Sequence, residues 1–267
     1  MSLRAYTAFI VAATFFLVIA GGLVTSTGSA LAVPDWPLSF GQLFPKMEGG
    51  VFYEHGHRMI AATVGLLTII LAVWLQRCAQ EPLLKKAGWV ALALVCAQGL
   101  LGGITVLLKL PAVASVGHAC LGQIFFSWMC CIGAMAWSER ASVVIAQAAK
   151  LRRLSLMTTG FVFFQLLFGA IYRHTGTMLH VHFVGAVLVF VHILLIFRSV
   201  RQYVAFDVWF TRPATIMAGL LFLQIGLGVY TWQRPGIANA TAHVAIGALL
   251  LALMSVISLQ SFRRVQA

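Results

Sequence analysis

Charged side chains are scarce in this chain. Only 9% of its 267 residues are Asp, Glu, Lys or Arg, and only six of those are acidic, whereas 61% of the residues are apolar. Together with a mean hydropathy of +0.96, this composition excludes an ordinary soluble domain, in which the apolar fraction is nearer half. The composition instead predicts an integral membrane protein.

The few charges separate eight apolar stretches, each long enough to cross a hydrocarbon core of roughly 30 Å as a helix. The stretches run over 5–24, 56–76, 87–108, 115–137, 154–172, 178–198, 213–232 and 241–261. No small-residue cleavage site follows the first stretch, so we expect a retained helix and not a removed signal peptide. The expected fold class is an all-α integral membrane protein with eight transmembrane helices.

Basic residues are distributed unevenly between the two ends of these helices. Thirteen of the 18 Lys and Arg residues, Arg140 among them, fall at one end. The other five are Lys46, Arg58, Lys109, Arg173 and Arg234. The positive-inside rule then predicts a bacterial-type cytoplasmic membrane with both termini cytoplasmic. Anionic lipid head groups account for the formal charge of +12. The sequence contains no nucleic-acid-binding motif, and we expect no nucleic-acid partner.

Cysteine is rare, and its positions exclude two kinds of covalent link. The five cysteines, Cys78, Cys96, Cys120, Cys130 and Cys131, lie inside or at the ends of apolar stretches. None belongs to a Cys-x-x-Cys-His sequence, so any heme is held noncovalently. The expected outer loops contain no cysteine at all, which excludes a structural disulfide in them.

Histidines mark an internal repeat. His57 and His118 are 61 residues apart, His182 and His243 are also 61 residues apart, and the second pair follows the first by 125 residues. Four helices, an even number, separate corresponding points, so the copies should have the same orientation and be related by an axis along the membrane normal. We therefore expect two tandem four-helix bundles, over 1–140 and 150–267, joined by a basic connector.

The two halves differ mainly in their first outer loop. His182 follows Gly176 by only six positions, whereas His57 follows the matching Gly28 by 29 positions. The extra residues lie in a predicted loop over 25–53, which contains Pro34-Asp35-Trp36-Pro37. We expect this loop to cover the first histidine pair, and therefore expect the two sites to differ.

Neutral imidazoles on two facing helices can bind a heme iron from both sides. We expect His57 to pair with His118 and His182 to pair with His243, at the outer ends of their helices. Each of the four is followed four residues later by Ala or Gly. His55 and His180 are the neighbouring alternatives, and the choice between His180 and His182 stays open.

One acidic residue distinguishes the first pair. Glu54 precedes His57 by three residues and therefore lies near it on the same helical face. A carboxylate beside only one iron is what an asymmetric pair of sites needs if one heme is a substrate and the other a cofactor. Two other roles for Glu54 are open: it could stabilise the positive helix N-terminus, or pair with Arg58 four residues on.

Several motifs resemble those of the heme A synthase family. They are Gly22-Leu-Val-Thr25, Thr27-Gly28-Ser29, Pro34-Asp35-Trp36-Pro37-Leu38 and Glu54-x-x-His57-Arg58, within two four-helix halves. Members of that family oxidise the C8 methyl group of heme O to the formyl group of heme A, for use in terminal oxidases. The resemblance implies that His57 and His118 flank the substrate heme. It also implies that His182 and His243 bind a heme b cofactor, and that Glu54 is needed for turnover.

The chain departs from the family pattern in one place. Many members carry cysteines on either side of the Pro-Asp-Trp-Pro-Leu segment, where this chain has Val33 and Ser39. The resemblance therefore implies a subgroup in which Trp36 and the prolines hold the loop.

Arg58 and Arg173 are candidates to bind the heme propionates.

The resemblance also implies which partners to expect. They are heme O, the lipid bilayer, an unidentified electron donor, and either the heme O-producing enzyme or an oxidase subunit. The competing hypothesis is a diheme b-type transmembrane cytochrome that passes electrons, for example from quinol, without chemistry on the heme. It explains the four histidines but not the lone Glu54 or the one-sided loop.

Overall fold

Long helices dominate the computed structural model, which describes residues 1–138 and 143–266. Within that part of the chain the helices are α1 (Leu3–Ser26), α2 (Gly50–Cys78), α3 (Pro82–Leu107), α4 (Ala112–Trp137), α5 (Ala148–Thr175), α6 (Leu179–Tyr203), α7 (Val208–Gln233) and α8 (Ile237–Arg263). Each has an apolar window of 18 residues with at most two charges. Such a window can cross a bilayer, so the predicted eight-helix membrane fold is confirmed.

Most helices are longer than the apolar stretches that predicted them. α2 begins at Gly50 and not at residue 56, so the loop before it covers 27–49 and Glu54 lies inside the helix. α7 begins five residues before Pro213, where the Asp207 carboxylate caps it by accepting a 2.9 Å hydrogen bond from the backbone N–H of Trp209. Apolar runs mark the hydrocarbon core, whereas capping groups and interfacial residues set the true helix ends.

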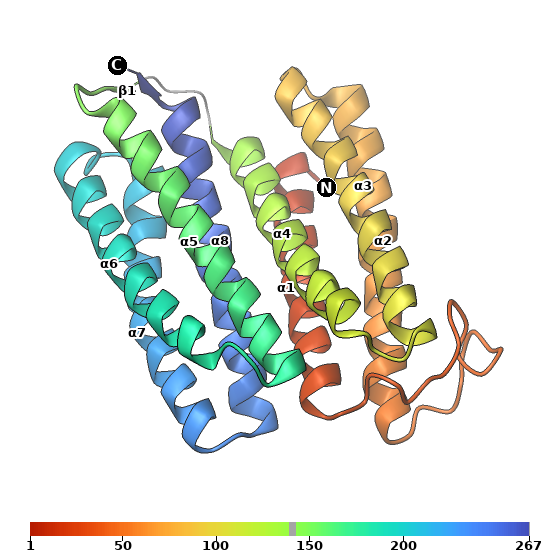
Figure 1. The fold of residues 1–267 in the computed structure, drawn as a ribbon. Helices are drawn as coiled ribbons and strands as arrows, with labels where there is room; N and C mark the ends of the chain where they lie inside the picture. The colour runs from red at the N-terminus through yellow and green to blue at the C-terminus, as the bar shows by residue number, and fades with distance from the viewer. Residues whose placement is uncertain (139–142, 267) are drawn as a thin grey trace.

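Each half of the chain closes into a ring of four helices. In the first half α1 packs against α2 and α4, and α3 packs between α2 and α4; α5 to α8 repeat the arrangement. Figure 1 shows α1 and α5 descending in the same direction, with the two rings side by side. The rings meet where α4 and α1 pack against α8 and where α4 packs against α5.

Apolar side chains fill the centre of each ring and the junction between the rings. Phe125, Met129 and Ile132 of α4 belong to the core of the first ring, and Phe210 and Met217 of α7 belong to that of the second. Between the rings, Phe126 of α4 packs against two small residues of α8, Ala248 and Ala252. Small residues let membrane helices approach closely, and this close approach joins the two halves.

Polar contacts fasten the end of the bundle that carries both termini. β1 (Val143–Val144) lies in the connector and pairs in parallel with β2 (Val265–Gln266) after α8. A buried ion pair of 2.8 Å joins Asp207 to Arg264. A second ion pair, Glu81 with Arg263, crosses between the halves with two contacts of 3.0 and 3.1 Å. Arg140, expected at this end, lies outside the described residues.

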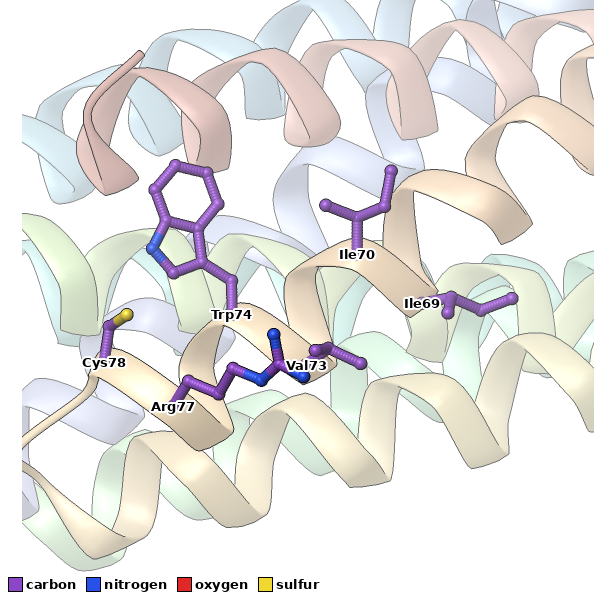
Figure 2. A pocket seen from close by; sticks show the side chains of 6 residues that line it. All are labelled: Ile69, Ile70, Val73, Trp74, Arg77 and Cys78. Atoms are coloured by element: carbon purple, nitrogen blue, oxygen red, sulfur yellow. The ribbon is translucent and has the colours of Figure 1, made fainter.

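A shallow groove of about 460 Å³ on α2 is unrelated to the predicted sites (Figure 2). Its lining side chains are Ile69, Ile70, Val73, Trp74, Arg77 and Cys78. All six belong to one helix, and the nearest of them is 12 residues beyond His57, roughly 18 Å along the helix axis. The groove is therefore part of the outer surface of α2 and not of a site between helices.

Candidate functional site

Each of the four predicted histidines lies against a glycine of the helix that precedes its own. A Cβ atom built on Gly21 would lie 3.1 Å from Cε1 of His57, and one built on Gly102, Gly169 or Gly228 would lie 3.0 Å from Cε1 of His118, His182 or His243, respectively. We call these four glycines the seat glycines. Any larger residue there would force the imidazole to move. The four glycines therefore fix the positions of the four imidazoles.

All four histidines lie in the first two turns of even-numbered helices. Because these helices run in the same direction, the four histidines lie at the end of the bundle opposite the termini. We call it the histidine end. Within each ring of helices, the two histidines come from helices that are not neighbours. This is the arrangement in which bundle proteins build cofactor sites between facing helices.

His182 and His243 face each other across the four helices of the second half. The centroids of their imidazoles are 6.3 Å apart, and the imidazole planes are inclined by 69°. An imidazole centroid lies about 1.1 Å from its nitrogens and a metal–imidazole bond is about 2.0–2.1 Å, so this separation suits one metal ion bound by both rings. The pair therefore fits bis-histidine ligation of a heme iron.

Hydrogen bonding orients the His182 ring. Its Nδ1 lies 3.2 Å from the backbone carbonyl oxygen of Gln165, to which it can donate. A ring that donates from Nδ1 leaves the Nε2 lone pair for a metal. In the structure Nε2 lies 3.3 Å from the Gln165 side-chain amide nitrogen.

Ring nitrogens of the first pair are not satisfied by the protein. His57 and His118 belong to α2 and α4 of the first ring of helices, and Nδ1 of each is buried without a hydrogen-bond partner among the described residues. Nδ1 of His243 is in the same situation. Buried polar atoms without partners are costly, so a bound group in contact with these imidazoles is one way to account for them.

The neighbouring histidines are in different surroundings. His180 is exposed, whereas His182 is partly buried. His55 is buried and its Nδ1 lies 2.8 Å from the Ser39 hydroxyl. Nδ1 of His192 lies 3.3 Å from the Thr158 hydroxyl, and its ring centroid lies 4.5 Å from that of Phe161 with the planes inclined by 58°. Of the two candidates on α6, only His182 faces His243.

Glu54 and Arg58 fasten the loop over 27–49, the cap loop, to α2. The Glu54 side chain is buried, and its two oxygens accept hydrogen bonds from the Val33 backbone N–H at 2.8 Å and from Arg58 at 2.7 Å. Arg58 also donates to the carbonyl oxygens of Asp35 at 2.7 Å and Leu38 at 2.9 Å. The i+4 ion pair with Arg58, one of the alternative roles of Glu54, is therefore present, and its contacts hold the cap loop in place.

Polar contacts fasten the two loop positions that flank the Pro-Asp-Trp-Pro-Leu segment. Val33 and Ser39, the two positions concerned, are both fully buried. Each is bonded to the first turns of α2, Val33 through Glu54 and Ser39 through His55. Sequence reasoning missed these contacts, because loop residues have no periodicity that would indicate their partners.

Trp36 brings the cap loop to the first histidine site. A Cβ atom on Gly103 would lie 2.7–2.9 Å from three carbon atoms of the Trp36 indole, so the ring lies directly on this glycine. The preceding residue, Gly102, is the seat glycine of His118. Two consecutive glycines of α3 thus contact His118 and Trp36, respectively. In the second half, the residue after the seat glycine Gly228 is Val229 and not a glycine.

Arg173 reaches from the second half of the chain to the first. Its guanidinium donates to the carbonyl oxygen of Gly22 at 3.2 Å and to the hydroxyl of Ser26 at 2.6 Å, both on α1. Ser26 in turn lies 3.0 Å from the Thr241 hydroxyl of α8. These contacts join the halves at the histidine end. Propionate binding by Arg58 or Arg173 stays a prediction.

The match to a known family covers the first site and part of the second. Residues 46–183, just over half of the chain, match the sequence profile of COX15-CtaA, the cytochrome oxidase assembly protein family. The matched range includes His57, His118 and His182.

The chain belongs to the cytochrome oxidase assembly protein family.

Individual relatives match this family member over 63 to 184 residues. Heme A synthase of Symbiobacterium thermophilum is 29% identical over 184 residues, which cover 66% of this chain and 60% of the relative. Heme A synthase of Bacillus licheniformis is 40% identical over 63 residues, 23% of this chain and 21% of the relative. Protoheme IX farnesyltransferase of Halobacterium salinarum is 30% identical over 124 residues, 46% of this chain and 28% of the relative. The chain thus spans less than two thirds of each relative.

Proposed function

We propose that this family member is a heme A synthase, an oxidoreductase that converts the C8 methyl group of heme O to the formyl group of heme A. One observation carries the proposal: two similar histidine sites stand side by side, and only the first is covered by a loop that a buried carboxylate fastens. Two equivalent electron-carrying hemes would not require this difference. The heme A synthases among the relatives support the same reaction.

The two histidine pairs have different roles in this proposal. His57 and His118 hold the substrate heme O and the product heme A in the N-terminal half, over 1–140. His182 and His243 hold a heme b cofactor in the C-terminal half, over 150–267. The assignment rests on Glu54 and Trp36, which belong to the first half. Glu54 precedes His57 by three residues, whereas the residue at the same distance before His182 is the apolar Leu179.

Oxidation of an unactivated methyl group requires redox chemistry that side chains lack, and heme iron supplies it when bound. The protein's own residues orient and enclose the reacting group. Trp36 and the cap loop cover the first site and keep water from it. Glu54, buried at the same place, is a carboxylate that can accept a proton, position a water molecule or stabilise positive charge at the oxidised carbon.

The membrane arrangement follows from the distribution of basic residues. We propose that both termini are cytoplasmic and that the histidine end faces the outer side of a bacterial-type cytoplasmic membrane. A heme held by His182 and His243 would offer electrons from an unidentified donor a route to the first site. Heme O has to be delivered from the enzyme that makes it, and heme A has to pass to an oxidase subunit.

Pigment extraction after co-expression with a source of heme O tests the proposal. The purified protein should yield heme b together with heme O, its hydroxylated intermediate or heme A, identified by mass spectrometry. The His118→Ala variant should lose the heme O-derived pigments and keep heme b. A protein that yields only heme b under these conditions is an electron-carrying cytochrome, and the proposal is then wrong.

A further inference from the structure

Large apolar side chains are exposed in the middle of the cap loop, over residues 38–44, which we call the loop tip. They are Leu38, Phe40, Leu43 and Phe44. The last two are the most exposed, with 70% and 78% of their surface accessible. No residue from 36 to 45 is charged. A contiguous apolar patch of this kind marks an interaction surface in many proteins.

The backbone of the loop tip forms its hydrogen bonds within the protein. Ser39 and Gln42 pair through two backbone N–H to carbonyl bonds of 3.0 Å each. Between them, the N–H groups of Phe40 and Gly41 donate to the two oxygens of the Asp35 carboxylate, at 2.7 and 2.8 Å. All four N–H groups of this turn therefore have protein partners. A backbone requires such internal pairing where water is scarce.

Phe40 has a backbone conformation that suits other residue types better. Its φ is +54° and that of Gly41 is +70°. Glycine adopts a positive φ readily, and asparagine is enriched there, whereas a bulky residue is strained. Strain of this kind persists where the surroundings compensate for it. The turn itself therefore does not explain why a phenyl group stands at this position.

Contacts of the cap loop place its tip beside the helices and not beyond their ends. Arg58, which donates to the carbonyl oxygen of Leu38, lies eight residues beyond the start of α2, roughly 12 Å along the axis. Gly103, against the Trp36 indole, lies four residues before the end of α3, roughly 6 Å along the axis. Both contact points fall within the apolar stretches of their helices. Figure 1 shows the loop alongside the first turns of α2.

We propose that the loop tip is anchored in the lipid bilayer, with Phe40, Leu43 and Phe44 inserted at the boundary between head groups and acyl chains. The position favours lipid over a protein partner, because the tip lies at the depth where the apolar stretches of α2 and α3 end. Its lack of charge and its internally bonded backbone suit that environment. Burial of the phenyl group in lipid then offsets the strain at Phe40. The inference does not rest on the proposed function.

A fluorescent label in nanodiscs that each hold one copy of the full chain tests this inference. The label is attached to Phe44→Cys in a Cys78→Ala/Cys96→Ala background, because these two native cysteines are exposed. The discs contain either ordinary phosphatidylcholine or phosphatidylcholine brominated on its acyl chains. We expect the brominated lipid to remove most of the fluorescence at position 44, and aqueous iodide to remove little of it.

Arg234→Cys provides the matched control position. Arg234 is exposed between α7 and α8, at the same end of the bundle as the cap loop. A label there should be quenched by iodide and not by the brominated chains. Equal quenching by lipid at the two positions overturns the inference. So does strong iodide quenching at position 44, because the tip of the single copy then lies in water and is left for a protein partner.

A polar variant separates insertion of the loop from insertion of the label. Phe40→Asn/Leu43→Asn removes two apolar side chains and keeps the turn, since asparagine accepts a positive φ. Quenching by lipid at position 44 should fall and quenching by iodide should rise. Thermal unfolding shows whether the variant folds, and Leu43→Asn alone replaces it if it does not. Unchanged quenching would mean that the label and not the loop enters the lipid, and the inference is then wrong. The measurement uses no heme O, so its outcome is independent of heme A formation.

Discussion

The carboxylate of Glu54 accepts a hydrogen bond of 2.8 Å from the backbone N–H of Val33, across 21 residues of sequence. This contact gives the acidic residue a structural role in addition to the catalytic one that we propose. The two roles can be separated in part, because a glutamine at this position keeps an oxygen acceptor for Val33, while it loses the charge and the second oxygen that accepts from Arg58. Substitutions of different kinds should therefore have different effects on the loop and on turnover.

We predict that Glu54→Gln lowers heme A formation by at least about 100-fold, as is typical for the loss of a group that handles protons in a reaction. Protease sensitivity of the cap loop should stay near that of the unmodified protein. Glu54→Ala should lose turnover and also expose the loop to proteolysis. Turnover is measured by chromatography of extracted hemes. A glutamine variant that forms heme A at the native rate would show that the charge is not needed.

The contact between Trp36 and Gly103 supports a second prediction. Gly103→Ala places a Cβ atom within 2.7–2.9 Å of the indole, so Trp36 must leave its position and uncover the first site. We expect heme A formation to fall by about 10-fold or more, since misplacement of about 1 Å at a reacting site can cost 100-fold. Heme b content should not change.

Gly99→Ala on the same helix is the matched control, because no atom lies within 4 Å of its Cβ position. It should leave both activity and heme content unchanged. Equal behaviour of the two alanine variants would contradict the role given to Trp36.

The seat glycines provide a third prediction. Gly228→Val should displace the His243 ring, whose Cε1 lies 3.0 Å from the Cβ position, and remove most of the heme b from the purified protein. Gly226→Val, two residues away, adds the same side chain where the Cβ position is open. It should retain heme b and the low-spin spectrum. Heme content is measured by the pyridine hemochrome assay, and retention by both variants would contradict the assignment of the second site.

The cap loop should also respond to acid through Asp35. Backbone N–H groups of Gly41 and Phe40 bind its carboxylate and hold its pKa below the ordinary value of 3.8. Because the pKa is lower in the folded state, the carboxylate stabilises the loop above the unfolded pKa, and this contribution is lost as the pH falls through the folded pKa. The 40–41 amides should therefore stay protected from hydrogen exchange, after correction for intrinsic rates, until the pH is below 3.8.

Asp35→Asn removes the charge at every pH. Its 40–41 amides should exchange faster than those of the unmodified protein near neutral pH and show no further acid-induced loss. If the unmodified loop loses protection well above pH 4, or if the asparagine variant shows the same pH profile, the carboxylate does not hold this turn.

Two ion pairs should differ in their effect on stability. Asp207 and Arg264 are buried, and Asp207→Ala removes both their charge-assisted hydrogen bond and the cap of α7, so it should lower the free energy of unfolding by about 2–4 kcal/mol. Lys46 and Glu48 are exposed, with 82% and 67% of their side chains accessible. Glu48→Ala should change stability by about 1 kcal/mol or less. Thermal unfolding in detergent measures both, and equal shifts in Tm would contradict this ranking.

Periodicity and spacing predicted the membrane fold because the bilayer constrains it strongly. A span of about 20 apolar residues has few alternatives to a transmembrane helix. The spacing of 125 residues between His57 and His182, and between His118 and His243, predicted the repeat before any coordinates. The helix ends were predicted less well, because residues such as Gly50 and Val208 lie outside the apolar runs.

Contacts between distant segments could not be predicted in this way. The bonds from Val33 to Glu54 and from Ser39 to His55 depend on how the cap loop folds back onto α2. The pairing of β1 with β2 joins segments more than 120 residues apart through two residues each, too few for a sequence pattern. One signal was available: the Gln-x-x-x-Gly spacing at Gln98 and Gln224 recurs at Gln165.

The central claim is that the first histidine pair holds a heme whose methyl group the protein oxidises. Its most direct test is to supply purified, heme b-loaded protein in membranes with heme O and to follow the extracted hemes over time by mass spectrometry. We predict that heme O declines while its hydroxylated form and then heme A appear, and that Glu54→Gln stops this conversion without loss of heme b. Recovery of unchanged heme O, under conditions in which a known heme A synthase converts it, would contradict the account.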